Sequence, residues 1–254
     1  MKARHTYLHI ETCNLCNRKC PWCLFGQTPD FRGSKLQFID NVYIEKLLNE
    51  LNQNHFTGVL SLYAINEPLM DKRIRDGSLL RLCRSELRRT DVKIIISTNG
   101  DLLNDSIAET MFYSGLDKMY VSCYEENTLN KAKDLKDKYE KMVILDNTNE
   151  KANNLKFNRA GSICSYSGYV AENKKSCTLP IFSSVVGFDG EVRLCSNDAI
   201  GQIKIGNIKN ENLYDILNSK KMRALRNQIL INKKNVFPCN ACNFEDLKEG
   251  EGFT

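Results

Sequence analysis

Residues 16–23 have the sequence CNRKCPWC, and this stretch decides how the rest of the chain is interpreted. Its three cysteines have the spacing C-x3-C-x2-C and follow an alternating segment, HTYLHIET (5–12), that predicts a first strand. A tetrahedral metal site takes four ligands, so either Cys13 supplies the fourth or one coordination position stays open. Zinc motifs favour paired C-x2-C or Cys/His units, so this spacing is a poor match to zinc.

The overall composition excludes several classes of protein. Of 254 residues, 42% are hydrophobic and 26% are charged, which suits one large domain, alone or with a small appendage. No apolar run approaches the roughly 18 residues that cross a bilayer, and residues 1–13 lack the apolar region of a secretory signal. The net charge of +5 is interspersed with acidic residues along the chain. We therefore expect a cytoplasmic protein with no nucleic-acid partner and no membrane partner.

Cysteine is the unusual component, with eleven residues in the chain. A reducing cytosol disfavours disulfides, so clustered cysteines indicate metal binding or catalysis. One group of four lies between residues 13 and 23, and single cysteines stand at 83, 123 and 164. The second group is Cys177, Cys195, Cys239 and Cys242. The two groups are the candidates for metal sites.

Hydrophobic patterns up to residue 150 alternate between strand and helix. Strands are predicted at 5–12, 58–65, 92–100, 118–124 and 142–148, and helices at 41–53, 79–89, 106–115 and 129–142. Asp40 is the predicted N-cap of the first helix. This alternation is typical of a parallel β/α architecture, either an open sheet or a barrel. The number of units is too small for a closed eight-stranded barrel.

The pattern changes after about residue 160. Residues 183–195 predict a hairpin around Asp189-Gly190, residues 211–230 predict one amphipathic helix, and PCNAC (238–242) supplies a C-x2-C pair. The hairpin cysteine and one further cysteine complete a set of four ligands. Four thiolates suit either structural zinc or a [4Fe–4S] cluster, and spacing alone leaves both open.

The first cysteine group resembles that of the radical S-adenosylmethionine (SAM) enzymes, through Cys16, Cys20 and Cys23. The resemblance implies that these thiolates hold three irons of a [4Fe–4S] cluster and that SAM chelates the fourth. One electron then cleaves SAM to a 5′-deoxyadenosyl radical, which abstracts hydrogen from the substrate. Cys13 would block the open iron, so we place it outside the cluster.

Three further motifs support this resemblance. Trp22, just before the third cysteine, is the typical aromatic residue that packs near the cofactor. Ile65-Asn66-Glu67-Pro68-Leu69 is similar to the family's Gly-Gly-Glu-Pro segment at the SAM amino group, with Asn66 where glycine is usual. Residues 97–100 (STNG) match the segment near the SAM ribose, which makes Ser97 and Asn99 candidate contacts. Either of the last two motifs, taken alone, is better explained as turn chemistry.

The C-terminal part resembles a shortened SPASM extension, called a twitch domain. The resemblance implies one auxiliary [4Fe–4S] cluster, bound by Cys177, Cys195, Cys239 and Cys242. The expected fold is therefore α/β, a partial (β/α) TIM-type barrel over residues 1–160 with a small hairpin-plus-helix extension over residues 161–254. The expected cofactors are two [4Fe–4S] clusters and SAM.

Twitch enzymes of this size include the aminocyclitol dehydrogenases of the 2-deoxy-scyllo-inosamine type, which oxidise a secondary alcohol to a ketone. The resemblance implies a small polyol, aminocyclitol or sugar as substrate, an auxiliary cluster that accepts an electron, and a flavodoxin or ferredoxin as electron donor. Arg159, within FNRAG (157–161), is the candidate substrate contact. A guanidinium stays protonated, so we expect electrostatic positioning from it rather than base catalysis.

Two alternatives remain open from the sequence. Related enzymes modify ribosomal peptides or epimerise their substrates, and Cys123, at the end of a predicted strand, is a candidate hydrogen-atom donor for such a reaction. A lone cysteine in an apolar strand is more often a small core residue. Because the first strand is predicted to begin near residue 5, we expect no N-terminal leader-peptide-binding module in this chain, which favours a small substrate. The second alternative is a non-enzymatic metal-binding protein.

Overall fold

One continuous sheet of eight strands organises the protein in the computed structural model, which describes residues 5–28, 30–88, 91–148, 158–163 and 175–244. Its strand order is β5-β4-β3-β2-β1-β6-β7-β8. The strands are β1 (Tyr7–Ile10), β2 (Val59–Ser61), β3 (Lys93–Thr98), β4 (Lys118–Cys123), β5 (Met142–Asp146), β6 (Ser183–Val186), β7 (Glu191–Arg193) and β8 (Gly206–Asn207). All neighbours from β5 to β6 in this order are parallel, and β7 and β8 add antiparallel pairs. The predicted partial barrel is confirmed.

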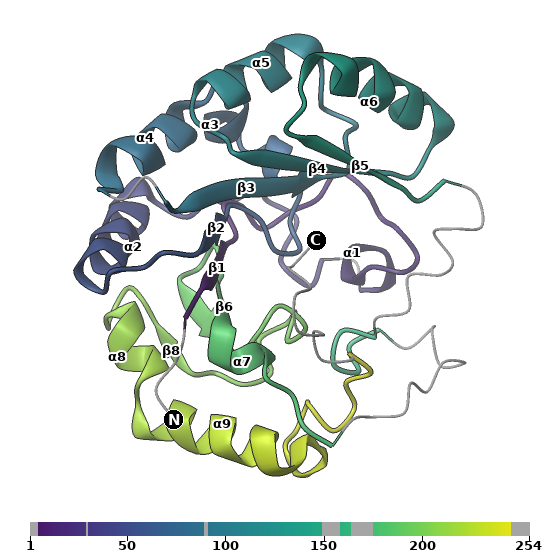
Figure 1. Ribbon diagram of the computed structural model, residues 1–254. Helices are drawn as coiled ribbons and strands as arrows, with labels where there is room; N and C mark the ends of the chain where they lie inside the picture. The colour runs from purple at the N-terminus through teal and green to yellow at the C-terminus, as the bar shows by residue number, and fades with distance from the viewer. Residues whose placement is uncertain (1–4, 29, 89–90, 149–157, 164–174, 245–254) are drawn as a thin grey trace.

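Helices cover one face of this curved sheet (Figure 1). The helical segments are α1 (Leu24–Gln27), α2 (Asn41–Gln53), η1 (Pro68–Met70), α3 (Lys72–Arg75), α4 (Ser78–Glu86), α5 (Asp105–Tyr113), α6 (Glu126–Lys138), α7 (Leu179–Phe182), α8 (Leu213–Leu217), α9 (Lys220–Asn232) and η3 (Lys233–Asn235). Those from α2 to α6 lie along the outer face, while α8 and α9 lie at the β8 end of the sheet (Figure 1). The loops that follow the parallel strands are therefore gathered at one edge, where sites of α/β folds are built.

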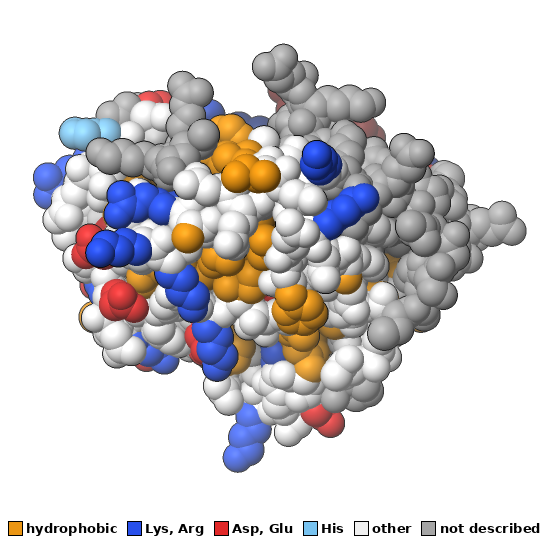
Figure 2. All heavy atoms as spheres, turned by 90° about the horizontal axis from the view of Figure 1, so that it is seen from below, with side chains coloured by type: hydrophobic (Ala, Val, Ile, Leu, Met, Phe, Trp, Pro, Cys, Tyr) orange, Lys and Arg blue, Asp and Glu red, His pale blue; other side chains and the backbone are white. Residues whose placement is uncertain are grey.

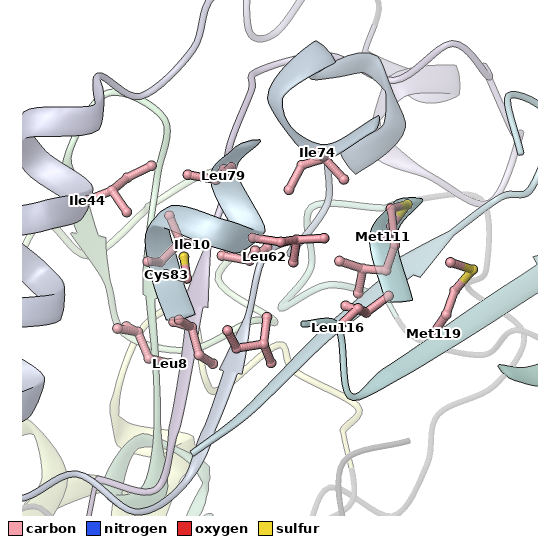
Figure 3. Packing of buried hydrophobic residues seen from close by; sticks show 14 of the residues in the cluster. Leu8, Ile10, Ile44, Leu62, Ile74, Leu79, Cys83, Met111, Leu116 and Met119 are labelled. Atoms are coloured by element: carbon pink, nitrogen blue, oxygen red, sulfur yellow. The ribbon is translucent and has the colours of Figure 1, made fainter. Parts of the chain in front are cut away.

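The two faces of the sheet have different side chains because successive residues of a strand point in opposite directions. On the helix-facing side, β1 contributes Leu8 and Ile10 to a large apolar core (Figure 3). Burial of each such side chain stabilises the fold by about 1.5–3 kcal/mol. On the opposite, concave side lies a smaller cluster that contains Tyr7 and Tyr120, with Tyr63 packed against it. The concave face therefore carries tyrosine side chains among aliphatic ones.

One predicted helix is wrong in its extent. The single helix expected over residues 211–230 is two helices, α8 and α9, with a break at Asn218 and Ser219. Ser219 is the N-cap of α9, and its Oγ accepts a hydrogen bond from Met222 N at 3.1 Å. A capping serine favours a new helix start over helix continuation, and this local signal outweighs the amphipathic pattern.

The sheet does not break at the expected domain boundary near residue 160. β6 lies in the C-terminal part of the sequence, yet it pairs in parallel with β1, where Tyr7 is opposite Ser183 and His9 is opposite Val185. The predicted hairpin is present as β6 and β7, which are antiparallel. The C-terminal segment is thus joined to the barrel through backbone hydrogen bonds along β1.

The face of the molecule seen from below carries basic side chains around an open hydrophobic area (Figure 2). Ile231 of α9 and Phe237 are 75% and 64% exposed, respectively. Among the described residues, no helix is both long enough and apolar enough to cross a membrane.

Candidate active site

The loop after β1 brings together the first set of cysteines. Cys16, Cys20 and Cys23 are all partly buried, and Cys23 N donates a hydrogen bond to Cys20 O at 3.0 Å. Burial, with a smaller contribution from the neighbouring thiolate charges, raises the pKa of Cys16 to about 12 and that of Cys20 to about 11. Metal-binding cysteine is a thiolate, so three such groups need a cationic centre to be stable together. The donor set therefore fits a thiolate-binding metal centre, such as an iron–sulfur cluster.

Gly26 permits the tight path of this cysteine loop. It belongs to α1, which begins directly after Cys23, and its N–H donates to Cys23 O at 3.0 Å. A Cβ atom at residue 26 would lie 2.1 Å from Cys20 O and 2.8 Å from Lys19 O. Only glycine fits this close backbone approach, which fixes the relative positions of the second and third cysteines.

The cysteine loop is anchored to the carboxyl end of β3 by polar contacts. The Arg18 guanidinium donates to both Asp101 oxygens, with Nε to Oδ2 at 2.6 Å and Nη2 to Oδ1 at 2.5 Å. The amide of Asn99 donates to Asn17 Oδ1 at 2.8 Å and lies 3.7 Å from Cys16 Sγ. Bidentate pairs of this kind define orientation as well as distance. The sequence analysis did not identify Arg18 or Asp101.

The predicted aromatic residue and the predicted serine lie beside this loop. Trp22 packs against Tyr124, just after β4, with ring centroids 5.5 Å apart. Ser97 is half-buried on β3 and shares the concave face of the sheet with Ile95. Both positions are at the edge where the cysteine loop lies, and their contact with SAM stays a prediction.

Glu67 connects the loop after β2 to the end of β3. Its carboxylate accepts hydrogen bonds from Leu69 N at 2.9 Å, Thr98 Oγ1 at 2.6 Å and Asn99 N at 2.8 Å. Burial is the largest effect on this group and raises its pKa to about 7, against the lowering by these donors. These three hydrogen bonds use most of the acceptor capacity of the carboxylate. Glu67 therefore holds the loop after β2 against the end of β3.

Asn66 is directed toward Cys13. Its Nδ2 donates to Cys13 Sγ at 3.5 Å, while its Oδ1 accepts from Ala64 N at 3.2 Å. Cys13 is fully buried and also lies 3.5 Å from Glu67 O. The amide added at the usual glycine position is thus used within the protein, which explains how the loop accommodates asparagine.

The second set of cysteines lines one cavity that is partly open to solvent. Its lining includes all four predicted ligands, Cys177, Cys195, Cys239 and Cys242. Within the described part of the chain, no three His, Cys, Asp or Glu side chains are close enough to share a single metal ion. Four thiolates around one pocket are a donor set that suits a [4Fe–4S] cluster or structural zinc.

The segment that carries Arg159 lies against this cavity. Residues 158–161 are described, whereas Phe157 and Cys164 are outside the described residues. Arg159 and Ala160 have φ values of +46° and +53°, which is rare for residues other than glycine. Ala160 lines the cysteine cavity. Such strain is typical of functional sites.

Polar residues on β1 and directly after it form a part of the site that the sequence analysis missed. His9 is 5% exposed, and Glu11 is fully buried. Glu11 pairs with two arginines, with Arg32 Nη1 2.7 Å from Oε1 and Arg193 Nη1 2.9 Å from Oε2. The alternation in HTYLHIET could have indicated these residues, because polar residues at every second position of a buried strand face the same side of the sheet.

Cys123 lies on the other side of the sheet. It is fully buried in the helix-facing core, which also contains Met119 and Val121 of the same strand. Tyr120, which is in register with the concave face, belongs to the opposite cluster. This placement gives no support to the role of hydrogen-atom donor, and it matches that of a small core residue.

Comparison with known proteins gives two domain matches. The radical SAM superfamily matches residues 10–149, and the SPASM iron–sulfur cluster-binding domain matches residues 177–243. A comparison with curated proteins found no match.

Several solved structures have a similar fold. BtrN in complex with AdoMet and 2-DOIA superposes with a TM-score of 0.81 and 22% identity, over 96% of this chain and 95% of BtrN. The anSMEcpe protein with bound AdoMet and Cp18Cys peptide has a TM-score of 0.59 and 14% identity, over 94% and 88%. SuiB of Streptococcus suis, bound to its precursor peptide SuiA, has a TM-score of 0.52 and 11% identity, over 94% and 70%. At these sequence identities the comparison shows a similar fold and nothing beyond it.

Proposed function

Because this chain belongs to the radical SAM superfamily, we propose that it oxidises a secondary alcohol of a small polyol, aminocyclitol or sugar to a ketone. It is a radical SAM enzyme, with [4Fe–4S] clusters and SAM as cofactors. The likeness to BtrN, whose structure holds AdoMet and 2-DOIA, supports a small-molecule substrate. A flavodoxin or ferredoxin as electron donor is part of this proposal.

The cysteines would hold two clusters. Cys16, Cys20 and Cys23 would bind the cluster at the carboxyl edge of the sheet, and the four cysteines of the C-terminal cavity would bind the auxiliary cluster. When bound, these groups with SAM supply an oxidant that removes a hydrogen atom from carbon and an acceptor for a second electron. The protein's own residues would position the substrate, make polar contacts with it and remove its hydroxyl proton.

The position of Arg159 is the observation that carries the proposal. On one side, its charge lies near enough to the concave face of the barrel to act on His9 and Tyr63, although burial is the main cause of the lowered pKa of His9 and of the raised pKa of Tyr63. On the other side, the adjacent Ala160 lines the auxiliary cysteine cavity. An alcohol bound at Arg159 would therefore lie between the barrel interior and the electron acceptor, as a two-electron oxidation requires.

Arg159 itself is suited to hold an oxygen atom. Its guanidinium remains protonated and offers up to five N–H donors, which bind a hydroxyl and stabilise an alkoxide as the oxygen loses its proton. Its left-handed backbone is followed by Ala160 and Gly161, which also have positive φ. This conformation fixes the direction of the side chain before the substrate arrives.

The proposal is tested with anaerobically reconstituted protein, SAM and a reductant, against a panel of aminocyclitols, inositols and sugars deuterated at the carbinol carbon. We expect a ketone that lacks two hydrogens, with deuterium transferred to 5′-deoxyadenosine. Arg159→Lys should reduce ketone formation, because lysine keeps the charge without the planar donor fork. Arg159→Met, which also removes the charge, should reduce it further. Lys209→Met, an exposed charge change, is the control.

The other reactions give different products. Net uptake of solvent deuterium at carbon without ketone would indicate epimerisation, and conversion of a peptide alone would indicate a peptide-modifying enzyme.

Iron content tests the second cluster, since two cubanes of four irons predict about eight per chain. Replacing Cys239 and Cys242 by alanine should leave about four and abolish ketone formation. Replacing the core residue Cys123 by alanine should leave the product unchanged.

A further inference from the structure

His9 lies on the concave face of the sheet, where the proposed substrate binds. It belongs to β1, and its neighbours Leu8 and Ile10 point into the helix-facing core (Figure 3). The alternation of a strand therefore turns His9 the other way. Its ring centroid is 4.6 Å from that of Tyr7 and 5.9 Å from that of Tyr63, both on the concave side.

The hydrogen bonds of His9 define which ring nitrogen carries the proton. Nδ1 is 3.0 Å from the backbone oxygen of Tyr63 and 3.1 Å from Ser61 Oγ. A carbonyl oxygen only accepts hydrogen bonds, so Nδ1 is the N–H donor. Burial lowers the pKa of His9 to about 4; the Tyr63 carbonyl and Glu11 oppose this, and Arg159 adds to it. The ring is therefore neutral at pH 7, with a lone pair on Nε2.

That lone pair has no hydrogen-bond partner among the residues that the structure describes. Nε2 is buried there, and His9 as a whole is only 5% exposed. Buried polar atoms are normally satisfied, and an exception points to a missing partner such as a ligand. A hydroxyl group supplies the O–H donor that a bare imidazole nitrogen lacks.

Four other titratable groups near His9 are poor proton acceptors. Arg159 is always protonated. Burial raises the pKa values of Tyr7 and Tyr63, which keeps both phenols protonated. The Glu11 carboxylate is held by Arg32 and Arg193, which lower its pKa against the opposing effect of burial. Among these described residues, His9 alone combines neutrality with a free lone pair.

We propose that Nε2 of His9 is the base that accepts the hydroxyl proton of the substrate during its oxidation, an assignment that rests on the proposed function. The carbinol carbon first loses a hydrogen atom to the SAM-derived oxidant and keeps one unpaired electron. The O–H bond then breaks, its proton moves to Nε2, and its electron pair stays on oxygen. One electron leaves to the auxiliary cluster, and the remaining two form the second carbon–oxygen bond of the ketone.

Two substitutions separate this role from a structural one. In His9→Asn, the shorter amide can still donate to Tyr63 O, but nothing replaces Nε2. In His9→Gln, a polar atom reaches the Nε2 position without being a base at neutral pH. We expect both to lower the kcat for ketone formation at least a hundredfold, the usual range for loss of a general base. Transfer of deuterium from the carbinol carbon to 5′-deoxyadenosine should continue in both, because that step precedes deprotonation.

A spectroscopic measurement is independent of turnover. The chain has three histidines, so 15N-histidine spectra of the reconstituted protein can be assigned by comparison with His9→Asn. We expect His9 to be neutral and protonated on Nδ1 from pH 8 down to about pH 5. Binding of the alcohol substrate without reductant should shift the Nε2 resonance, as expected when it accepts an O–H hydrogen bond.

The outcomes distinguish this assignment from the proposed function. If the wild-type protein converts no alcohol to a ketone, the proposed function fails and the assignment fails with it. If the wild type forms ketone and His9→Asn does so within tenfold of its rate, only the assignment is overturned. Recovery of the rate in His9→Gln, or an Nε2-protonated ring, would also overturn it, since neither is compatible with Nε2 as a base.

Discussion

Asn158 and Asn243 hold each other through two reciprocal hydrogen bonds: Asn158 N donates to Asn243 Oδ1 at 2.9 Å, and Asn243 N donates to Asn158 Oδ1 at 3.2 Å. Asn158 Nδ2 also donates to Ala241 O at 2.6 Å. One asparagine precedes Arg159 and the other follows Cys242 in the sequence. The candidate substrate contact and a candidate ligand of the auxiliary cluster are therefore held in one unit.

This pairing predicts that Asn158→Ala impairs the reaction without emptying the auxiliary site. The substitution removes the side chain that joins Arg159 to the C-x2-C loop, and displacement of a positioning group by about 1 Å can cost on the order of a hundredfold in rate. We expect ketone formation to fall about ten- to a hundredfold, with iron content and SAM binding unchanged. Asn210→Ala, at an exposed turn, should behave as the wild type. Loss of iron in Asn158→Ala would instead assign the pair to cluster binding.

Gly26→Ala should prevent assembly of the first cluster. A Cβ atom at this position would lie 2.1 Å from Cys20 O, so the loop between the second and third cysteines must move. We expect iron to fall from about eight to about four per chain and SAM cleavage to be lost. Gly33→Ala is a matched control, since its Cβ meets nothing within 4 Å and its φ of +77° costs only about 1–2 kcal/mol. Full iron loading of Gly26→Ala would refute this role for Gly26.

Glu11 should contribute to stability in a pH-dependent way. Burial raises its pKa, but Arg32 and Arg193 outweigh burial and hold the pKa below the ordinary value of 4.5. The folded state therefore binds this proton more weakly than the unfolded state. The contribution of Glu11 is fully present above pH 4.5 and is lost as the pH falls below it toward the folded-state pKa.

Glu11→Gln tests this contribution. It leaves two buried guanidinium groups without their counter-charge and should lower the free energy of unfolding by about 3–5 kcal/mol at pH 7. Urea unfolding of the anaerobic protein at several pH values measures both effects, and the difference from wild type should shrink below pH 4.5. Asp105→Asn removes an exposed partner of Lys138 and should have little effect, because exposed ion pairs are weak. A pH-independent difference would contradict the assignment.

The order of strands and helices up to residue 150 could be predicted from the sequence because each element carries its own local period. The parallel pairing of β6 with β1 could not, since it joins segments that are far apart in the chain and nothing local specifies it. Cysteine spacing indicated two groups of thiols, because short loops leave few other uses for clustered cysteines, and their role as cluster ligands stays a prediction. Cys177, distant from its C-x2-C partners, shares their cavity only through the fold.

The direction of single side chains was harder to predict than the elements. A shift of one residue reverses the face of a strand, so Cys123 could be assigned to either side of the sheet until the structure placed Val121 and Tyr120 of the same strand on opposite sides. For the same reason His9 and Glu11 were not identified, although polar residues in and directly after a buried strand were the available indication. The burial of Lys233 could not be predicted either, because the neighbouring sequence of a buried lysine does not differ from that of an exposed one.

Lys233 is a buried positive charge at the auxiliary site. It is 1% exposed, lines the four-cysteine cavity, and its Nζ donates to Cys242 O at 3.3 Å and Phe244 O at 3.1 Å. A nearby cation favours the reduced, more negative state of a cluster, which suits an electron acceptor. A unit charge at about 10 Å and an effective dielectric constant of about 20 contributes about 1.7 kcal/mol. For one electron this is about 70 mV, since a tenfold change in equilibrium is 59 mV.

Lys233→Gln should therefore lower the reduction potential of the auxiliary cluster by about 50–100 mV while retaining a donor for the two carbonyl oxygens. Redox titration followed by electron paramagnetic resonance measures the potential, and iron analysis verifies that the cluster is present. The matched control is Lys234→Gln, the exposed neighbour, whose charge is screened by water and should leave the potential within about 10 mV. Equal shifts in both variants would show that the burial of Lys233 has no specific effect on the cluster. A lower potential slows transfer of the second electron, so ketone formation in Lys233→Gln should fall together with the potential.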